Sequence, residues 1–439
     1  MPLEMPMIKS LGNKVRPVVQ AFTQLNRQEA IADSEIAEGK NLSSELFPVL
    51  TCRPSREIIK TIALPNALFA AGNGKLCYVS GTNFTYDNVV KGQVSAGPKS
   101  MADFNNKIII MPDKKYYDYV TGVFGNIGGG AYPAAGSCPD IDFITSHMNR
   151  LFGVKGNNIY ATALGEYNDW TTFAGDNLDA YAVDRVEPGS FTGIVDFQQH
   201  VNLWKPGYMF ENYGAYPAQY QQQKICEIGC IDGRTIDEAN NRLYFLGNMG
   251  GMYEYSGGLP RFISTTLNDE FVAGIGVSDG RRYYLSAQNK AGKWGLFVYD
   301  TWREVWMPED DLQVIDFTKI GNTVYALDVD GNIIKFNSGS EAVISELYTK
   351  KFDDSIMGRK QISGFKLQVD LDPGSTINIY LSVDGQTFKL IESNMDHKYN
   401  ILSAKCKIER GLRYQFKIAI KGKYKLYGFR REFVVGGDI

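Results

Sequence analysis

The sequence has 439 residues, 44% of them hydrophobic and 13% aromatic, which excludes a disordered chain and allows more than one buried core. Its 46 Lys and Arg residues nearly balance 49 Asp and Glu residues, which argues against a dedicated free nucleic-acid-binding protein. There is no apolar signal core at the start and no run of 18 apolar residues, so we expect no membrane anchor and a chain made in the cytoplasm.

Residues 1–56 lack the pattern that follows them. Glutamates and small apolar residues over 29–38 are compatible with one short helix, but their hydrophobic stripe is weak. Segments of this composition are ordered only when they are tied down. We therefore expect an N-terminal arm, residues 1–56, that lies on another surface of the same chain or of a neighbouring copy.

Hairpins with an Asn- or Gly-led turn and tyrosine in their strands recur from residue 57 onward. The clearest has strands at Arg150–Lys155 and 158–164 around a Gly-Asn-Asn turn. Hairpins begin near positions 74, 106, 150, 199, 241, 281 and 322, at a spacing close to 40 residues. Such a period, with room for four strands per repeat, predicts an all-β chain with a β-propeller over 57–340. The fourth hairpin is weak, so we expect about seven blades, with six as the alternative.

Three further features suggest how the blades pack. An outer strand is expected before several hairpins, at 98–104, 191–197 and 314–318. We expect the strand at 58–63 to close the ring by pairing with the blade at 311–340. Tryptophans that follow hairpins are expected to fill gaps between blades: Trp170, Trp302 and Trp306.

Two insertions interrupt the period, at 122–142 and 211–224. Long loops on a rigid scaffold are common contact sites, although a merely tolerated insertion is the alternative. The second insertion carries three tyrosines that would suit sugar rings: Tyr213, Tyr216 and Tyr220.

Alternating strands after residue 340 predict a separate antiparallel, jelly-roll-like β-sandwich over 341–439. From residue 345 to the end there are 17 Lys and Arg against 11 Asp and Glu, a net charge of +6, so the remainder carries −9. The simplest interpretation of this asymmetry is a solvated basic face.

No residue pattern in the sequence indicates chemistry. The three histidines, His147, His200 and His397, have no nucleophile in a recognisable frame beside them. Cys226 and Cys230 lack a second ligand pair at zinc spacing, so buried thiols are expected for all six cysteines. The glycines at 128–130 lack the Lys and Ser/Thr of a phosphate loop.

Aspartates in Asp-Gly pairs are best explained by hairpin turns rather than by calcium binding: Asp232, Asp279, Asp330 and Asp384. We also find no acidic pair typical of a glycosidase. The sequence therefore predicts no catalytic residue, no metal ligand and no cofactor, and a protein that is not an enzyme.

One stretch carries a resemblance. The segment 150–173 is similar to a motif found in virion proteins of tailed phages. The residues that match this motif are Arg150, Leu151, Tyr160, Thr162, Gly165, Asp169 and Trp170. Shorter matches follow in the same order at 211–214, 228–230, 243–246 and 252–258, and earlier at Asn41, Leu42, Pro48 and Arg53. Over about residues 40–340 the chain resembles β-propeller proteins of phage tails, of the packaged-DNA stabilisation or tail-nozzle type.

This resemblance implies a structural virion protein of the neck or tail, assembled as a ring of copies around the DNA channel. Its implied partners are head–tail proteins such as the portal, the adaptor and tail components, with passive contact to genomic DNA. The main alternative is a receptor-binding tail protein that recognises a host glycan through the sandwich or the tyrosines at 211–224. A hydrolase is the third possibility.

Overall fold

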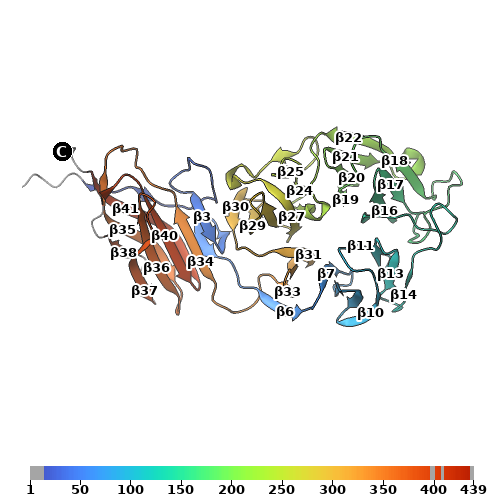
Figure 1. The fold of residues 1–439 in the computed structure, drawn as a ribbon, viewed down its shortest axis with the longest axis horizontal. Helices are drawn as coiled ribbons and strands as arrows, with labels where there is room; N and C mark the ends of the chain where they lie inside the picture. Colours follow the sequence, from blue (N-terminus) through green and yellow to red (C-terminus); the bar gives the residue numbers. More distant parts are fainter. Residues whose placement is uncertain (1–13, 396–400, 407–409, 436–439) are drawn as a thin grey trace, which may run out of the picture.

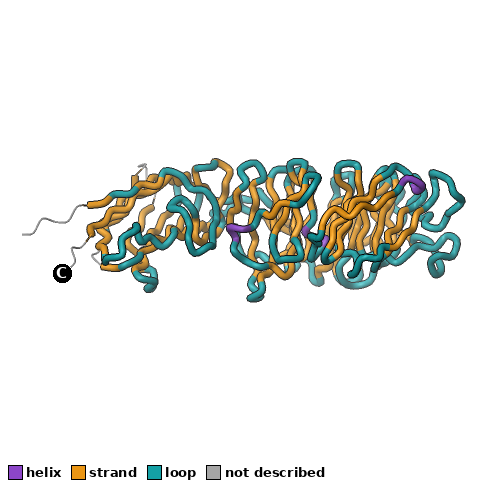
Figure 2. The backbone as a smooth tube through the Cα atoms, turned by 90° about the horizontal axis from the view of Figure 1, so that it is seen from above, coloured by secondary structure: helices purple, strands orange, loops and turns teal. Residues whose placement is uncertain are grey.

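The computed structural model describes residues 14–395, 401–406 and 410–435 and confirms an all-β chain. A β-propeller occupies one end of an elongated molecule and a β-sandwich the other (Figure 1). Seen edge-on, the two units form one slab of nearly even thickness (Figure 2). Within the described residues, no helix is long and apolar enough to cross a membrane.

Seven four-stranded antiparallel sheets form the blades of the described propeller. Blades 1 to 3 comprise β7 (Pro65–Ala70), β8 (Leu76–Ser80), β9 (Asn83–Tyr86) and β10 (Val89–Gln93); β11 (Ser100–Phe104), β12 (Lys107–Met111), β13 (Lys115–Asp118) and β14 (Phe124–Asn126); and β15 (Phe143–His147), β16 (Arg150–Lys155), β17 (Asn158–Ala161) and β18 (Tyr181–Asp184). Blades 4 and 5 comprise β19 (Gly193–Phe197), β20 (His200–Lys205), β21 (Tyr208–Tyr213) and β22 (Gln221–Cys226); and β23 (Asp237–Ala239), β24 (Arg242–Leu246), β25 (Met252–Tyr255) and β26 (Arg261–Phe262). Blades 6 and 7 comprise β27 (Phe271–Ser278), β28 (Arg282–Asn289), β29 (Trp294–Asp300) and β30 (Val305–Pro308); and β31 (Val314–Ile320), β32 (Thr323–Asp328), β33 (Asn332–Lys335) and β6 (Glu57–Thr61). Short 3₁₀ turns lie between strands: η1 (Pro217–Gln219), η2 (Gly233–Thr235) and η3 (Thr265–Leu267).

The first strand of each blade lies at the centre of the propeller, because first strands of neighbouring blades contact one another. The segments 98–104, 191–197 and 314–318, which we expected to be outer strands, supply these inner strands. That expectation was wrong, since hydrogen bonding within a hairpin does not reveal which edge faces the axis.

Two-residue turns with left-handed backbone join the first and second strands in several blades. Both turn residues have positive φ at Asn105 (50°) and Asn106 (63°), and again at Asn240 (50°) and Asn241 (62°). This geometry matches the twist of paired strands, and asparagine tolerates it well. Local turn chemistry therefore accounts for the repeated hairpins.

The ring closes between the two ends of the array. Strand β6 pairs antiparallel with β33, with Glu57 opposite Lys335 and Ile58 opposite Ile334. This pairing confirms the predicted closing strand at 58–63. Because β6 belongs to the N-terminal segment, the last blade depends on residues far away in the sequence.

The sandwich consists of two antiparallel sheets, and the arm supplies strands to both. The larger sheet contains β38 (Ile401–Lys405), β35 (Lys360–Leu371), β41 (Tyr424–Val435), β5 (Val49–Cys52) and β4 (Leu42–Leu46), with β1 (Lys14–Val15) and β2 (Val18–Val19) paired to β41 and β39 (Arg410–Gly411) paired to β35. The smaller sheet runs β3 (Ile36–Lys40), β34 (Ile344–Thr349), β40 (Tyr414–Lys421), β36 (Thr376–Val383) and β37 (Lys389–Met395). The short helix considered for 29–38 is absent from the described chain; a bend and the start of β3 occupy that segment.

One hydrophobic cluster runs from the propeller through the arm into the sandwich. In the arm, Phe22, Leu25 and Ile36 are at most 3% exposed, and they join Trp306 of blade 6 to Phe365 of the sandwich in that cluster. The Leu25 amide also donates to the Trp306 carbonyl at 2.9 Å. The arm therefore lies on its own chain and connects the two units.

Candidate functional site

The motif that carries the phage resemblance holds a long loop onto blade 3. The buried Arg150 guanidinium donates to the carbonyls of Thr162 at 2.6 Å and Asn177 at 2.6 Å, and also to that of Asp179. The Thr162 hydroxyl accepts from the Leu151 amide at 3.0 Å. These contacts fix the loop 162–180 that follows β17, so the motif stabilises the fold.

The tryptophans differ in their environments. Trp170 is 1% exposed and packs in a cluster that joins blades 2 and 3, as expected. Trp306 is equally buried, against the arm. Trp302 is 63% exposed, with the Arg281 guanidinium 4.7 Å from its ring centroid, so the expectation that it fills a gap between blades was wrong.

The histidines and cysteines that we considered for chemistry take part in packing and local hydrogen bonds. His147 Nδ1 lies 2.8 Å from Asp196, and the His200 ring packs against that of Tyr213 in a tilted arrangement, with the centroids 4.3 Å apart. Burial raises the pKa of the Cys230 thiol to about 12, and its sulfur donates to the Asp232 carbonyl. His397 lies outside the described residues.

The segment 211–224 is part of blade 4, and the expectation of an inserted loop there was wrong. It covers the end of β21, the turn η1 and the start of β22. Tyr213 donates to Glu211, and Tyr220 packs edge-on against Phe152 and Tyr181. These two tyrosines are therefore occupied by packing within the propeller.

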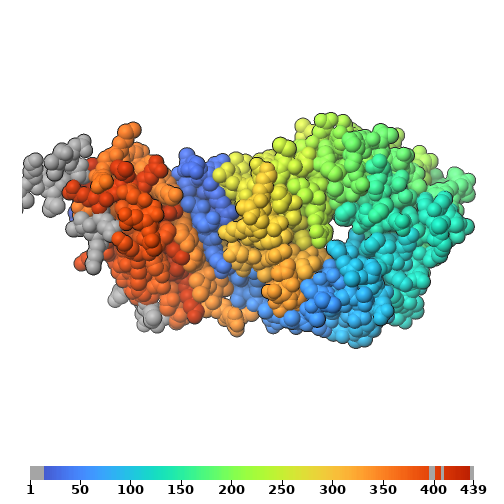
Figure 3. Space-filling view, viewed as in Figure 1, coloured from blue at the N-terminus to red at the C-terminus, as the bar shows by residue number. Residues whose placement is uncertain are grey.

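The central channel of the propeller opens between the blades and is visible in Figure 3. At one mouth, a cavity of about 520 Å³ is lined by residues that begin the inner strands of blades 2 to 5. Lys99 lies there, 1% exposed, paired with Asp113 at 2.8 Å. Burial opposes ionisation of Asp113, but the Lys99 ammonium and the Ser95 amide outweigh it and hold its pKa below the ordinary value.

The turn η2 pushes Arg234 into this mouth. A Cβ on Gly233 would lie 2.4 Å from the Thr192 carbonyl, so only glycine allows the turn to approach blade 4 this closely. Asp232 accepts from the Arg234 backbone amide at 3.0 Å and from its guanidinium at 2.6 Å. The Asp232-Gly233 pair thus forms a 3₁₀ turn between blades 4 and 5, so the expectation of a hairpin turn was wrong for this pair.

Asp316 of blade 7 is the strongly perturbed acid of the channel. Burial raises its pKa to about 7, outweighing the Leu68 amide, which donates to the carboxylate at 2.8 Å, and the charge of Arg234. The residue as a whole is half-buried, while its carboxyl group is turned into the protein, where the Leu68 amide reaches it. The described residues contain no cluster of three or more His, Cys, Asp or Glu suited to a metal ion.

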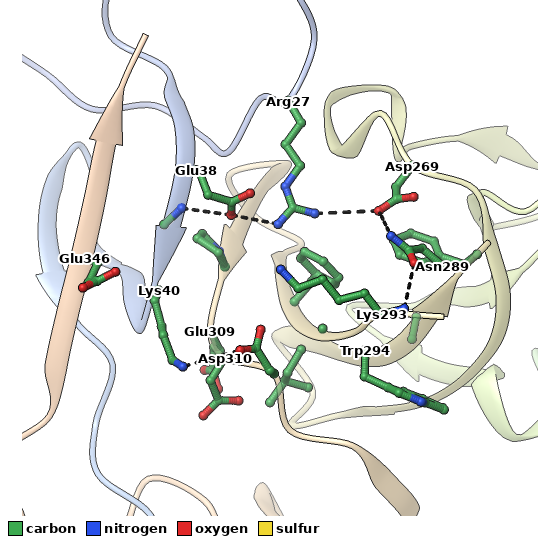
Figure 4. A pocket seen from close by; sticks show the side chains of 18 of the residues that line it. Arg27, Glu38, Lys40, Asp269, Asn289, Lys293, Trp294, Glu309, Asp310 and Glu346 are labelled. Carbon is green, nitrogen blue, oxygen red and sulfur yellow. Dashed lines mark hydrogen bonds and ion pairs between the residues drawn. The ribbon is translucent and has the colours of Figure 1, made fainter. Parts of the chain in front are cut away.

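A second cavity, of about 200 Å³, lies at the seam between the arm, blade 6 and the sandwich (Figure 4). Arg27 crosses it, 2.8 Å from Glu38 of β3 and 3.9 Å from Asp269 of the propeller. Asp269 also accepts from the Asn289 amide group at 3.0 Å. The charged side chains that line this cavity are therefore paired with one another and connect the units.

Beside this cavity, four charges are almost removed from solvent. Arg56 pairs with Glu309 and lies 2.8 Å from Asp310, while Arg53 lies 3.3 Å from Asp310. The Arg56 guanidinium also sits 4.4 Å from the ring centroid of Phe336. This cluster, named here the arm clamp, fixes the arm immediately before the closing strand β6.

No family model and no curated protein matches this sequence. Solved structures that resemble it include PorZ, a surface component of the type-IX secretion system of Porphyromonas gingivalis, with 12% identity and a TM-score of 0.43 over 70% of this chain and 44% of PorZ. Hsv2 of Kluyveromyces lactis matches with 10% identity and a TM-score of 0.36, over 55% of this chain and 74% of Hsv2. An exo-β-1,3-galactanase of Phanerochaete chrysosporium matches with 9% identity and a TM-score of 0.28, over 85% of this chain and all of that one. The chain thus spans less than half of PorZ, and at these TM-scores the likenesses carry no argument about function.

Proposed function

We propose that this chain is a non-enzymatic structural protein of a tailed-phage virion, placed at the neck or tail as part of a nozzle or collar. Copies of it form a ring around the DNA channel. Its partners are head–tail proteins such as the portal, the adaptor and tail components, and the genomic DNA passes without tight binding. The proposal takes its virion context from the motif at 150–173.

The observation that carries the structural role is the sharing of the N-terminal segment between both β units. Strands β1–β5 complete the sandwich and β6 completes the propeller. Units joined only by a linker are expected to move relative to each other, whereas a shared core and shared strands hold them together. A closed ring requires two different faces at a fixed angle, which one rigid subunit provides.

Native mass spectrometry of the purified full-length protein, with image averages of the same sample, tests this proposal. We expect closed rings with sixfold or twelvefold symmetry. A particle reconstruction should then locate the chain between the head and the tail tip. The proposal would be contradicted if the protein stayed monomeric at every concentration up to its local concentration in a virion. An open helical assembly would also contradict it.

A second candidate function, glycan recognition by a receptor-binding tail protein, is favoured by the outer face of the smaller sandwich sheet. There Tyr348, Lys417 and Tyr380 lie in one row across three neighbouring strands. The Lys417 ammonium lies 5.1 Å from the Tyr348 ring centroid and 5.8 Å from that of Tyr380. Trimers that bind a glycan array, with binding lost in Tyr380→Ala, would favour this function over the ring.

A further inference from the structure

The outer face of the larger sandwich sheet presents a concentration of positive charge. Along β35, Phe365, Leu367 and Val369 are buried, and the residues between them, Lys366 and Gln368, are exposed. Because side chains alternate across a strand, Lys366 and Gln368 point away from the core. The sheet therefore has one apolar face inside the sandwich and one polar face toward solvent.

Strand register brings cations from three strands onto this outer face. Lys366 lies opposite Arg430 of β41 on one side and opposite Ser403 of β38 on the other. Lys405 lies opposite Gly364, and Lys425 lies opposite a carboxylate residue, Asp370. With the two cations of the neighbouring arm strand and turn, they form what we name the basic face: Lys14, Arg16, Lys366, Lys405, Lys425 and Arg430.

Few negative charges balance this face. Glu432 accepts from both Lys14 and Arg16 at 3.0 Å, and these two cations hold its pKa at about 2. Asp370, the other carboxylate there, accepts from the Tyr427 hydroxyl at 2.8 Å. Within the described chain, the remaining four cations form no ion pair closer than 4 Å, although Lys425 has Asp370 as its cross-strand neighbour and the Nε atom of Arg430 is buried without a hydrogen-bond partner. The face therefore keeps unneutralised charge.

The spacing of these cations suits a charged polymer. Lys405 and Lys425 lie opposite β35 residues that are six positions apart. At roughly 3.3 Å per residue, this separation spans about 20 Å. A duplex carries one phosphate per about 1.7 Å of axis, so roughly six base pairs would pass over the face.

The composition of the face distinguishes a phosphate backbone from a protein partner. Protein interfaces gain most affinity from buried aromatic or apolar anchors near their centre. Here the exposed apolar side chains, Val18 and Ile401, lie on the flanking strands, while Ser403 and Gln368 lie among the cations. Lysine, arginine and small polar side chains are the groups that contact DNA backbones.

We propose that the basic face binds the phosphate backbone of duplex DNA, without sequence preference and weakly enough for the DNA to move. This inference deepens the proposed function and rests on it for the choice of DNA as the polyanion. The near balance of charge in the whole chain does not oppose it, because the cations of the basic face outnumber the two carboxylates beside them.

Fluorescence anisotropy of a labelled 24-base-pair duplex, titrated with the full-length protein between 25 and 200 mM salt, tests the inference. With four free cations engaged, the plot of log K against log salt should have a slope of about −3.6. Lys366→Ala/Arg430→Ala should reduce the steepness by about 2 and weaken binding at least tenfold at 25 mM salt. Duplexes of unrelated sequence should bind alike.

A matched control removes two lysines of the propeller, Lys75 and Lys290, as Lys75→Ala/Lys290→Ala. Their ammonium groups are exposed and lie in surface ion pairs, so the fold should tolerate their loss. This control should bind DNA within twofold of the wild type. The inference would be overturned if the wild type did not bind duplex at 25 mM salt, or if the control lost as much affinity as Lys366→Ala/Arg430→Ala. It would also be overturned if Lys366→Ala/Arg430→Ala bound duplex normally and instead lost self-association.

The two proposals fail separately. Rings that do not bind duplex would refute the DNA-binding face and leave the structural role intact. A protein that binds duplex through the basic face but never forms rings would refute the proposed assembly and leave the DNA-binding face intact.

Discussion

The arm clamp provides the sharpest test of the idea that one segment stabilises both units. Arg56→Met keeps most of the apolar length of the side chain and removes its charge. The change leaves Glu309, whose side chain is 8% exposed, without its shortest partner, and it removes the guanidinium from the Phe336 ring. We expect the closing strand β6, which starts at the next residue, to loosen first.

The expected cost follows from this geometry. Removing one partner of a buried ion pair costs about 3–5 kcal/mol, because the other charge stays buried without compensation. Arg53 remains 3.3 Å from Asp310 and 3.9 Å from Glu309, so it takes up part of the stranded charge. We therefore expect the lower end, about 3 kcal/mol. At roughly 2 °C per kcal/mol for a large domain, the melting temperature should fall by about 6 °C.

Thermal unfolding and hydrogen exchange together measure this effect. Exchange should accelerate in peptides covering 57–61 before it does in the other blades. Arg185→Met is the matched control, because Arg185 also pairs with a nearby carboxylate, Glu187, and lies 4.8 Å from a phenylalanine ring centroid, but stays within the propeller. If Arg56→Met lowers the melting temperature no more than this control, or leaves exchange in β6 unchanged, the argument fails.

Three further changes test separate parts of the fold. Arg150→Met should cost about 3 kcal/mol, because two buried carbonyls and one part-buried carbonyl lose a charged donor, and chymotrypsin should then cut within 162–180 at concentrations that spare the wild type. Asp316 keeps its proton up to pH about 7 in the folded chain but loses it near 3.8 when unfolded, so its contribution to stability is full below pH 4 and is lost as the pH rises through 7. The melting temperature of the wild type minus that of Asp316→Asn should therefore fall between pH 4 and 7 and then stay constant; a constant difference throughout would contradict the raised pKa. Gly233→Ala should cost about 1–3 kcal/mol, since its Cβ would lie 2.4 Å from a backbone carbonyl, whereas Gly129→Ala, with no atom within 4 Å, should be neutral in the same unfolding assay.

The propeller could be predicted from sequence because its signals are local. Pairs such as Asn105-Asn106 adopt the left-handed turn that their side chains tolerate, and each turn fixes a hairpin without reference to the rest of the chain. The assignment of β11 and β19 to the channel could not be predicted. Which end of a four-stranded sheet faces the axis depends on packing between blades, and a hairpin pattern does not contain that information.

The strand pairing of the arm could not be predicted from local sequence patterns for the same reason. Its strands pair with partners more than 300 positions away, as Lys14 does with Val434 and Lys40 with Glu346. Over 29–38 the charged side chains that suggested a helix serve tertiary contacts, and Arg27 meets Glu38 across the seam. The channel acid Asp316 gave no signal either, because its raised pKa comes from burial between blades.

Sharing one segment between two β units also constrains how the molecule comes apart. In the sandwich, the buried Arg431 guanidinium lies 2.8 Å from Asp354 and 2.6 Å from Asp33, so charge also anchors the middle of the arm. Releasing the arm would remove the Asp33 partner of Arg431, expose the apolar side chains that join the two cores and free β6 from β33. Each of these losses opposes partial opening, and together they favour a propeller and a sandwich that unfold as one cooperative unit. The proposed ring would require such coupling, because its subunits must hold two different faces at a fixed angle.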